Sequence, residues 1–184
     1  MATLILLGIG ANADGAWGAP PNTLLRAREA LAAAGLDIIA SSPAYVTEAL
    51  GPGRQRPHLN AVLAARSNLP PGALLRLAKR IERQAGRRLG RRWGPRALDI
   101  DLLDMRGKRY GWPPCRRYPG RLILPHPEMH RRAFVLVPLL DVAPSWRHPV
   151  LDLAGRTLLA RLPARHRRGV GRSLDFVASA CDKP

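Results

Sequence analysis

Residues 37–65 decide the fold of this chain: they begin with DIIASSPAYVT (37–47) and end with HLNAVLAA (58–65). Each of these two runs is typical of a β-strand, and Gly and Pro residues punctuate the loop between them. No helical period separates the two runs. We therefore expect consecutive strands here, which favours an antiparallel sheet over a purely alternating parallel one.

Helices are predicted on both sides of this pair of strands. Asn22-Thr23 is expected to cap the first and Pro70-Pro71 to open the second, and apolar residues follow each at helical spacing. Further strands are expected at 3–8, before the first helix, and at 97–104, after the second. The order β-α-β-β-α-β predicts an α+β fold, a ferredoxin-like core with a mostly antiparallel sheet flanked by helices.

The 184 residues are expected to form one domain over 1–162, followed by a basic, loosely ordered tail over 163–184. Late in the domain we expect a short strand at 122–124, a helical turn opened by Pro127 and a buried apolar run at 134–140. No apolar run approaches the roughly 18 residues that a membrane span needs. The two cysteines suggest no disulfide framework, so we expect the protein in the reducing cytoplasm. We also expect it to be a monomer.

The charge of the chain is large and unevenly placed. Its formal net charge is +17. Residues 76–96 carry nine basic side chains and one acidic one, and residues 106–121 carry six basic and no acidic side chains. Such a field favours a polyanionic ligand, either a nucleotide or a nucleic acid. The alternative is arginine distributed over a solvated surface.

Asp99 and Asp101 are the sharpest chemical signal, because residues two apart in a strand point to the same side. Two carboxylates placed there repel each other, and burial would raise their pKa values, unless a cation lies between them. Mg²⁺ prefers a few carboxylates together with phosphate oxygens and water. The pair therefore predicts a floor for a metal–triphosphate complex, where two ions could act. The alternative is an exposed strand face paired with Arg96 or other cations.

An arginine-rich loop precedes this strand. Its basic side chains are Arg87, Arg88, Arg91, Arg92 and Arg96. Guanidinium groups bind phosphate oxygens through paired N–H donors, so the loop could close over a triphosphate and exclude water. Trp93, within the loop, is interpreted as a packing residue.

Three other patterns are weaker. GIGANA (8–13) resembles a dinucleotide fingerprint, but no helix is expected before about Asn22, and the lack of a Walker A sequence excludes a P-loop kinase. His126 and His130 lie four apart, but no third zinc ligand accompanies them. Aromatic residues alternate with basic ones near 110–118, as in single-strand nucleic-acid binding, but without a recognisable nucleic-acid motif.

Several stretches together resemble the 6-hydroxymethyl-7,8-dihydropterin pyrophosphokinase family, whose members are also called 2-amino-4-hydroxy-6-hydroxymethyldihydropteridine diphosphokinases. The most specific are RWGPRALDIDLL (92–103) and LPHPEMHRRAFVLVPL (124–139). LGIGAN (7–12), LGP (50–52) and LNA (59–61) are similar to shorter family motifs, and all five occur in the family's order.

The resemblance implies Mg²⁺-dependent transfer of pyrophosphate from ATP to the hydroxymethyl oxygen of the pterin, with release of AMP, in folate synthesis. It places two Mg²⁺ ions on Asp99 and Asp101. The implied catalytic arginines are Arg87, Arg92 and Arg96. The implied nucleotide contacts are Glu82, Ile100, Arg121, Ile123, His126 and Arg132. The implied pterin contacts are Thr47, Leu50, His58, Asn60 and Phe134, with His58 standing where the family usually has Tyr or Phe.

We therefore expect a cytoplasmic transferase whose partners are two small molecules, ATP and the pterin, and which needs neither a membrane nor a nucleic acid. One alternative is a different DxD-type metal-nucleotide transferase, which a pterin-dependence assay would separate. The other is a basic nucleic-acid-binding module, whose affinity would fall steeply with salt.

Overall fold

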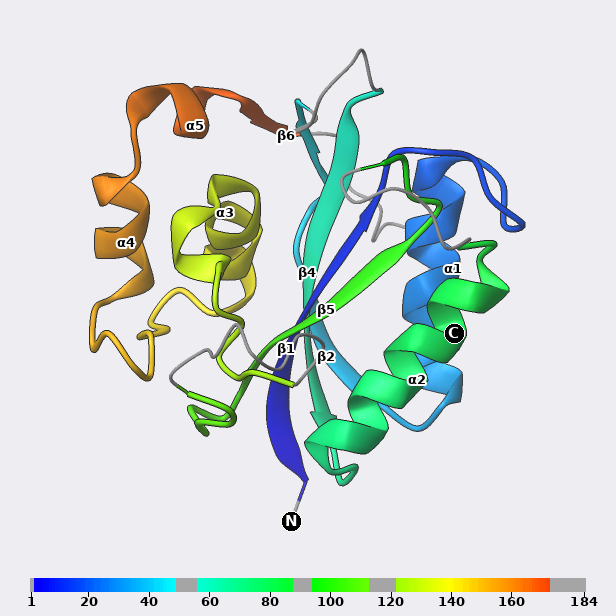
Figure 1. Cartoon of the computed structure of the whole chain (residues 1–184), viewed down its shortest axis with the longest axis horizontal. Helices are drawn as coiled ribbons and strands as arrows, with labels where there is room; N and C mark the ends of the chain where they lie inside the picture. Colours follow the sequence, from blue (N-terminus) through cyan, green and yellow to red (C-terminus); the bar gives the residue numbers. More distant parts are fainter. Residues whose placement is uncertain (1, 49–55, 88–93, 113–121, 173–184) are drawn as a thin grey trace, which may run out of the picture.

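The computed structural model describes residues 2–48, 56–87, 94–112 and 122–172. Figure 1 shows their arrangement. In chain order the elements are β1 (Thr3–Ala11), α1 (Pro20–Ala33), β2 (Asp37–Ser41), β3 (Tyr45–Thr47), β4 (His58–Ser67), α2 (Pro71–Gln84), β5 (Asp99–Met105), the 3₁₀ turn η1 (Met129–Arg131), α3 (Ala133–Val142), α4 (Gly155–Arg161), α5 (Ala164–Arg168) and β6 (Val170–Arg172).

The strands form one sheet in the order β5-β1-β4-β3-β6, and β2 also pairs with β4. The pairs that join these strands are all antiparallel. The β1–β4 pair is the longest, running in register from Thr3 opposite Ser67 to Ala11 opposite Leu59. The predicted α+β fold with a mostly antiparallel sheet is confirmed.

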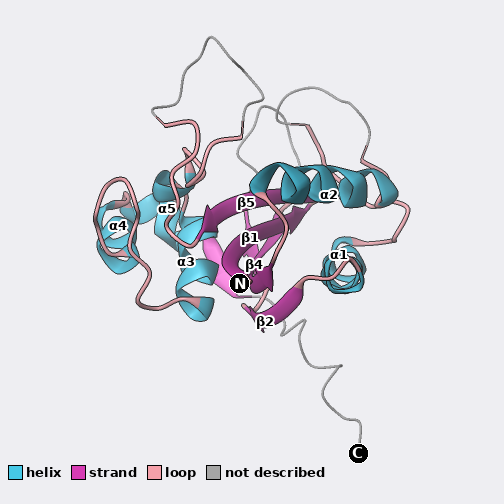
Figure 2. Ribbon diagram, turned by 90° about the horizontal axis from the view of Figure 1, so that it is seen from below, coloured by secondary structure: helices cyan, strands magenta, loops and turns pink. Residues whose placement is uncertain are grey.

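Each face of the sheet carries its own hydrophobic core, because side chains alternate along every strand. Figure 2 shows α1 and α2 on one face and α3 with α4 on the other. Ile5, Leu7 and Ile9 of β1 point to the core beneath α1 and α2. Leu6 points to the smaller core beneath α3, which also contains Leu139. Further along β1, Gly8 and Gly10 follow Leu6 on the α3 side and add no side chain to this core.

The start of the first helix differs from the prediction. Helix α1 begins at Pro20, and its N-cap residue is Ala19, which makes no side-chain capping bond. Proline suits this position because its ring presets the helical φ and the first helical N–H has no partner within the helix. Thr23 lies inside the first turn, and its Oγ1 donates a hydrogen bond to the Gly18 carbonyl at 3.3 Å.

Two strand predictions also need correction. The run 37–47 is divided into β2 and β3, because Ser42 turns inward and its Oγ accepts a hydrogen bond from the Val62 N–H at 2.9 Å. The expected strand at 122–124 is reduced to a single bridge between Tyr110 and Leu124. Pro125, which has no N–H to donate, follows that bridge directly.

Part of the predicted tail has defined structure. Residues 164–168 form α5, and β6 pairs with β3, while residues 173–184 lie outside the described residues. The division of the chain at residue 162 stays a prediction. Within the part of the chain that the structure describes, none of the helices has the length and apolar character needed to cross a bilayer.

Candidate active site

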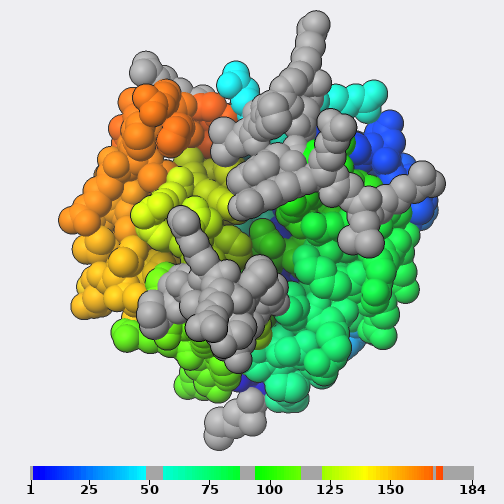
Figure 3. Space-filling view, viewed as in Figure 1, coloured from blue at the N-terminus to red at the C-terminus, as the bar shows by residue number. Residues whose placement is uncertain are grey.

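A cavity of about 680 Å³ opens on the face of the sheet that α3 covers only in part. Figure 3 shows this side of the molecule in space-filling form. Its walls come from β5, β1, β4 and β3 and from the turn that leads into α3. The lining residues are Gly8, Ile9, Gly10, Thr47, Glu48, His58, Asn60, Ala61, Val62, Gly94, Arg96, Asp99, Asp101, Leu103, His126, Glu128, Arg131, Arg132, Phe134 and Val135.

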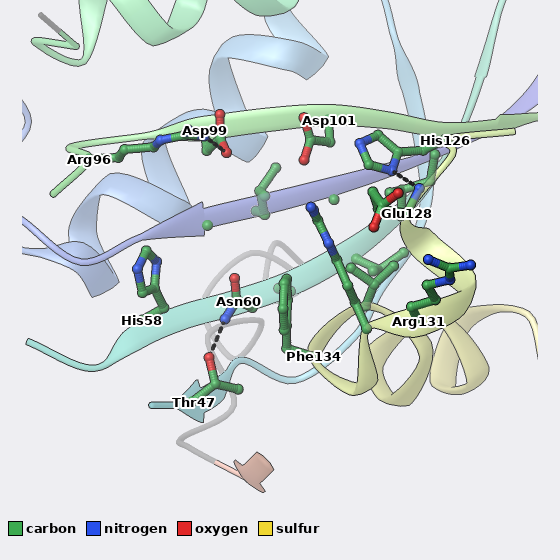
Figure 4. Close-up of a pocket in the computed structure, with 18 of the residues that line it drawn as sticks. Thr47, His58, Asn60, Arg96, Asp99, Asp101, His126, Glu128, Arg131 and Phe134 are labelled. Carbon is green, nitrogen blue, oxygen red and sulfur yellow. Dashed lines mark hydrogen bonds and ion pairs between the residues drawn. The ribbon is translucent and has the colours of Figure 1, made fainter. Parts of the chain in front are cut away.

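Two glycines of β1 form the middle of the cavity floor. Gly10 lies between Asp99 of β5 and Asn60 of β4, and Gly8 lies between Asp101 and Val62. Because glycine has no side chain, β1 leaves open space between the acidic residues on one neighbouring strand and the amide on the other. Figure 4 shows Asp99 and Asp101 on one side of this gap and Asn60 on the other.

Asp99 is held by two arginines. The guanidinium groups of Arg87 and Arg96 each donate to one of its carboxylate oxygens. Burial alone would raise the pKa of Asp99, but Arg96 and Arg87 outweigh burial and lower it. The carboxylate of Asp101 lines the cavity and makes no hydrogen bond or ion pair with any residue that the structure describes. The pair thus combines one neutralised carboxylate with one that is open to a ligand.

Glu82 of α2 supports this strand from the opposite face of the sheet. Its side chain is 1% exposed. One carboxylate oxygen accepts from the Ile100 N–H and from Lys79 Nζ, both at 2.8 Å, and the other lies 2.7 Å from Arg87. Burial raises the pKa of Glu82, while Lys79 and the Ile100 amide act in the opposite direction. Because Ile100 separates Asp99 from Asp101, Glu82 is bonded to the backbone between the two carboxylates.

His126 stands beside Asp101 (Figure 4). The ring Nδ1 accepts a hydrogen bond from the Glu128 N–H at 3.2 Å, and the backbone N–H of His126 donates to the Leu103 carbonyl at 2.8 Å. Burial lowers the pKa of His126, which favours the neutral ring. With Nδ1 acting as the acceptor, the neutral ring carries its proton on Nε2, so the free edge of the imidazole is a donor.

The opposite wall is neutral and begins with Asn60. Its Nδ2 donates to Thr47 Oγ1 at 2.8 Å, which leaves Oδ1 as an acceptor toward the cavity. A Cβ on Gly10 would lie 2.7 Å from that Oδ1, so only glycine gives the amide its room. Thr47, 5% exposed, is held in place by the pairing of β3 with β4.

Two rings complete the neutral wall. Phe134, at the start of α3, lies beside Asn60 (Figure 4). The guanidinium carbon of Arg132 is 5.7 Å from the centre of the Phe134 ring. His58 lies two residues from Asn60 along β4 and shares its face. Burial, and then the charge of Arg96, lower the pKa of His58, which favours a neutral ring here too.

The donor set suits a hard divalent cation that brings further ligands with it. The described residues contain no group of three or more His, Cys, Asp or Glu side chains that could enclose a metal. Asp99 and Asp101 supply two sets of carboxylate oxygens from the same face of β5. Mg²⁺ is typically bound through one or two carboxylates plus substrate phosphates and water, so these residues fit a Mg²⁺–phosphate complex.

Most of the predicted site residues meet in this cavity, but not all of them. Its walls include Thr47, His58, Asn60, Arg96, Asp99, Asp101, His126, Arg132 and Phe134. Glu82 is buried behind β5, the Ile100 side chain is fully buried in the core, and Ile123 is half-buried outside the cavity lining. Leu50, Arg92 and Arg121 lie outside the described residues.

Several lining residues were not assigned a role from the sequence. Gly8 and Gly10 were noted within a motif, but their function depends on what lies opposite them across the sheet. Glu48, Glu128 and Arg131 also line the cavity. Glu128 and Arg131 lie within the motif at 124–139, but the sequence does not show which of its side chains face the cavity. Glu48 lies outside the quoted motifs, and charged residues of this kind are common on any surface.

Comparison with known proteins finds relatives over most of the chain. A family model described as 7,8-dihydro-6-hydroxymethylpterin-pyrophosphokinase (HPPK) matches residues 6–144. A relative from Methylorubrum extorquens, named 2-amino-4-hydroxy-6-hydroxymethyldihydropteridine pyrophosphokinase, is 37% identical over 171 residues, which cover 92% of this chain and 98% of the relative. A protein of the same name from Pseudomonas aeruginosa is 42% identical over 112 residues, covering 61% of this chain and 65% of its own length.

Solved structures support the fold independently. The crystal structure of Plasmodium falciparum HPPK-DHPS A437G/K540E with pterin and p-hydroxybenzoate matches with a TM-score of 0.69 at 14% identity, over 94% of this chain and 47% of that chain. The wild-type structure matches with a TM-score of 0.62 at 15% identity, over 88% and 45% respectively. This chain therefore spans about half the length of those proteins.

Proposed function

The chain belongs to the 7,8-dihydro-6-hydroxymethylpterin-pyrophosphokinase family, and we propose that it transfers pyrophosphate from ATP to the hydroxymethyl oxygen of 6-hydroxymethyl-7,8-dihydropterin, with release of AMP. This is the transferase activity of a pyrophosphokinase in folate synthesis. The observation that carries the proposal is the gap over Gly8 and Gly10, with paired carboxylates on one side and an open amide acceptor on the other. A cytoplasmic location stays a prediction from cysteine usage.

The acidic side is proposed to take the triphosphate. Asp99 and Asp101 would hold Mg²⁺, with two ions expected from the family resemblance, and the metal would supply charge neutralisation at the reacting phosphates. Arg87 and Arg96 are proposed to exchange Asp99 for phosphate oxygens when the nucleotide arrives. His126, which stands beside Asp101, would donate its Nε2–H to a phosphate oxygen. These groups hold the β-phosphorus in line and stabilise the charge that develops around it.

The neutral side is proposed to take the pterin. The Oδ1 of Asn60 would accept a hydrogen bond from an N–H group of the pterin, and the Phe134 ring would stack on the bicycle. A pterin held there would face the acidic strand across the glycines, so its hydroxymethyl oxygen would be directed toward the β-phosphorus. Positioning of both reactants in one cavity accounts for much of the catalysis expected of such a site.

The test is an assay of AMP formation by the full chain with ATP, Mg²⁺ and 6-hydroxymethyl-7,8-dihydropterin. We expect AMP to form at a rate that depends on all three components, and to stop when EDTA is added. AMP formation without the pterin, or transfer to another acceptor at a higher rate, would instead support a different DxD-type transferase. Steeply salt-dependent binding of single-stranded nucleic acid, with no pterin-dependent AMP formation, would support the nucleic-acid-binding alternative.

A further inference from the structure

The geometry points to strand β6 as a support for the substrate site: by flanking β3 it holds Thr47, and through Thr47 the amide of Asn60, and so sets the affinity for the pterin. This inference rests on the proposed function. It concerns residues 170–172, which lie beyond the segment 6–144 that the family model matches. It makes a segment near the C-terminus, outside the matched range, a determinant of the substrate side of the site.

Strand β3 is short and depends on its neighbours. It has three residues, and it lies between β4 and β6 in the sheet. Thr47 is opposite Val170, and Tyr45 is opposite Arg172. Without β6, β3 would be a three-residue edge strand with one row of backbone N–H and C=O groups unpaired. Such a strand frays easily, since few hydrogen bonds hold it.

The inner face of β3 is the part that reaches the site. Tyr45 and Thr47 are 8% and 5% exposed, whereas Val46 between them is 40% exposed. The Tyr45 hydroxyl donates to Asp141 Oδ2 of α3 at 2.8 Å, which ties the start of β3 to the helix layer. The end of β3 has no such tie to α3, and there Thr47 Oγ1 accepts the Asn60 Nδ2–H. The pairing of Val170 with Thr47 thus fixes the end of β3 that is bonded to the side-chain amide of Asn60.

Strand β6 is expected to affect the proposed pterin side of the cavity and not its acidic side. In the sheet order β5-β1-β4-β3-β6, strands β1 and β4 separate β3 from the carboxylates on β5. The segment is also fixed independently of β3, because α5 and β6 contact α3. Figure 1 shows β6 reaching the sheet from the end of α5, at the margin away from β5. Loss of β6 is therefore expected to loosen the amide of Asn60 and leave Asp99 and Asp101 as they are.

The experiment removes the pairing while keeping the rest of the chain. In antiparallel pairing, consecutive residues direct their N–H groups to opposite sides, so the double variant Val170→Pro/Gly171→Pro removes the N–H groups opposite Thr47 and Val46, whichever of the two donates to β3. The N–H of Arg172, opposite Tyr45 at the other end of β3, is retained. The matched control is Val170→Ala/Gly171→Ala, which retains both N–H groups. A Cβ at Gly171 would lie 3.9 Å from the Val46 carbonyl oxygen, an ordinary contact. Pterin and MgATP affinities are measured separately by calorimetry, and the unfolding temperature is recorded.

We expect the double proline variant to bind the pterin about tenfold more weakly, with MgATP affinity within about twofold of the unaltered chain. The alanine control should bind both as the unaltered chain does. Unchanged pterin affinity would overturn the inference, and so would an equal loss of both affinities or an unfolded variant, since β6 would then support the whole fold. A chain that ends after Arg172 provides a second control and should keep full pterin affinity. If the unaltered chain binds no pterin, the proposed function fails rather than the role of β6.

Discussion

The two sides of the cavity are held in different ways. On the β5 side, opposite charges are already paired: Arg87 joins Asp99 to the buried Glu82, and Arg96 joins Asp99 as well. On the β4 side, a single neutral hydrogen bond from Asn60 to Thr47 sets the amide. A charged ligand must therefore rearrange the first side, whereas a neutral ligand meets the second side already formed. The difference suggests a phosphate side that is adjustable and a pterin side that is preorganised.

The largest effect should come from removing the open carboxylate. We expect Asp101→Ala to lower the rate of AMP formation about a thousandfold, or about 4 kcal/mol in the barrier, because the proposed Mg²⁺ would lose a ligand. The Asp101 carboxylate makes no hydrogen bond or ion pair within the described segments, so the unfolding midpoint should not change. Glu128→Gln is the control, since it removes another carboxylate from the same cavity. Equal losses in both variants would show that the aspartate pair has no special role.

The next effect tests how much the buried Glu82, which is bonded to the strand of the acidic side, stabilises the fold. Glu82→Ala should destabilise the fold by about 3 kcal/mol, because the Ile100 N–H loses its acceptor in the core and Arg87 loses a buried partner. Glu82→Gln keeps an acceptor for the amide and should lose less. The urea midpoint measures both variants. Equal midpoints for the alanine and glutamine variants would mean that the bond to Ile100 contributes little.

The pterin side is tested directly by removing its amide. Asn60→Ala should weaken pterin binding by about 1–3 kcal/mol, since the buried polar groups of the ligand lose their partner. MgATP affinity should stay the same, because Asp99 and Asp101 lie across the glycine gap. Calorimetry with each ligand separates the two sides. A comparable loss of MgATP affinity would contradict the division of the cavity into two sides.

A smaller effect should follow from filling the floor next to Asn60. Gly10→Ala places a Cβ 2.7 Å from Asn60 Oδ1, so the amide must shift, and we expect pterin affinity to fall about tenfold. Gly8→Ala is the matched control on the same strand and face, since its Cβ would meet the Leu103 side chain at an ordinary 3.5 Å. If both variants bind the pterin equally, the Asn60 amide is not held as rigidly as this comparison requires.

The smallest effect concerns His58. Because burial and Arg96 lower the pKa of His58 from 6.5, its ring gains charge only below that pH. His58→Phe should therefore change pterin affinity by less than about 1 kcal/mol, and both proteins should follow the same course between about pH 7 and 9. Titrations of pterin binding across that range provide the measurement. A divergence that begins above pH 7 would show that a charged imidazole takes part.

The sequence by itself determined the fold class and the acidic half of the site. Two strand-like runs without a helix between them favoured antiparallel pairing, and Asp99 and Asp101 share a side because a strand alternates with period two. Both are local properties, which is why they could be predicted. The helix start at Pro20 was predicted less accurately. An Asn-Thr pair is a common helix cap, and only the backbone shows that Asn22 and Thr23 lie inside the helix.

Only the tertiary structure decided which distant residues act on one another. Arg87 and Arg96 both reach Asp99, Gly10 makes room for an amide on the next strand, and β6 lies beside β3 from 123 residues further along the chain, counted from Thr47 to Val170. These relations depend on strand register and on the order of strands in the sheet, which no local pattern records. The position of the acidic pair on one face thus depends on neighbouring residues, whereas the shape of the proposed pterin side is set by contacts between strands.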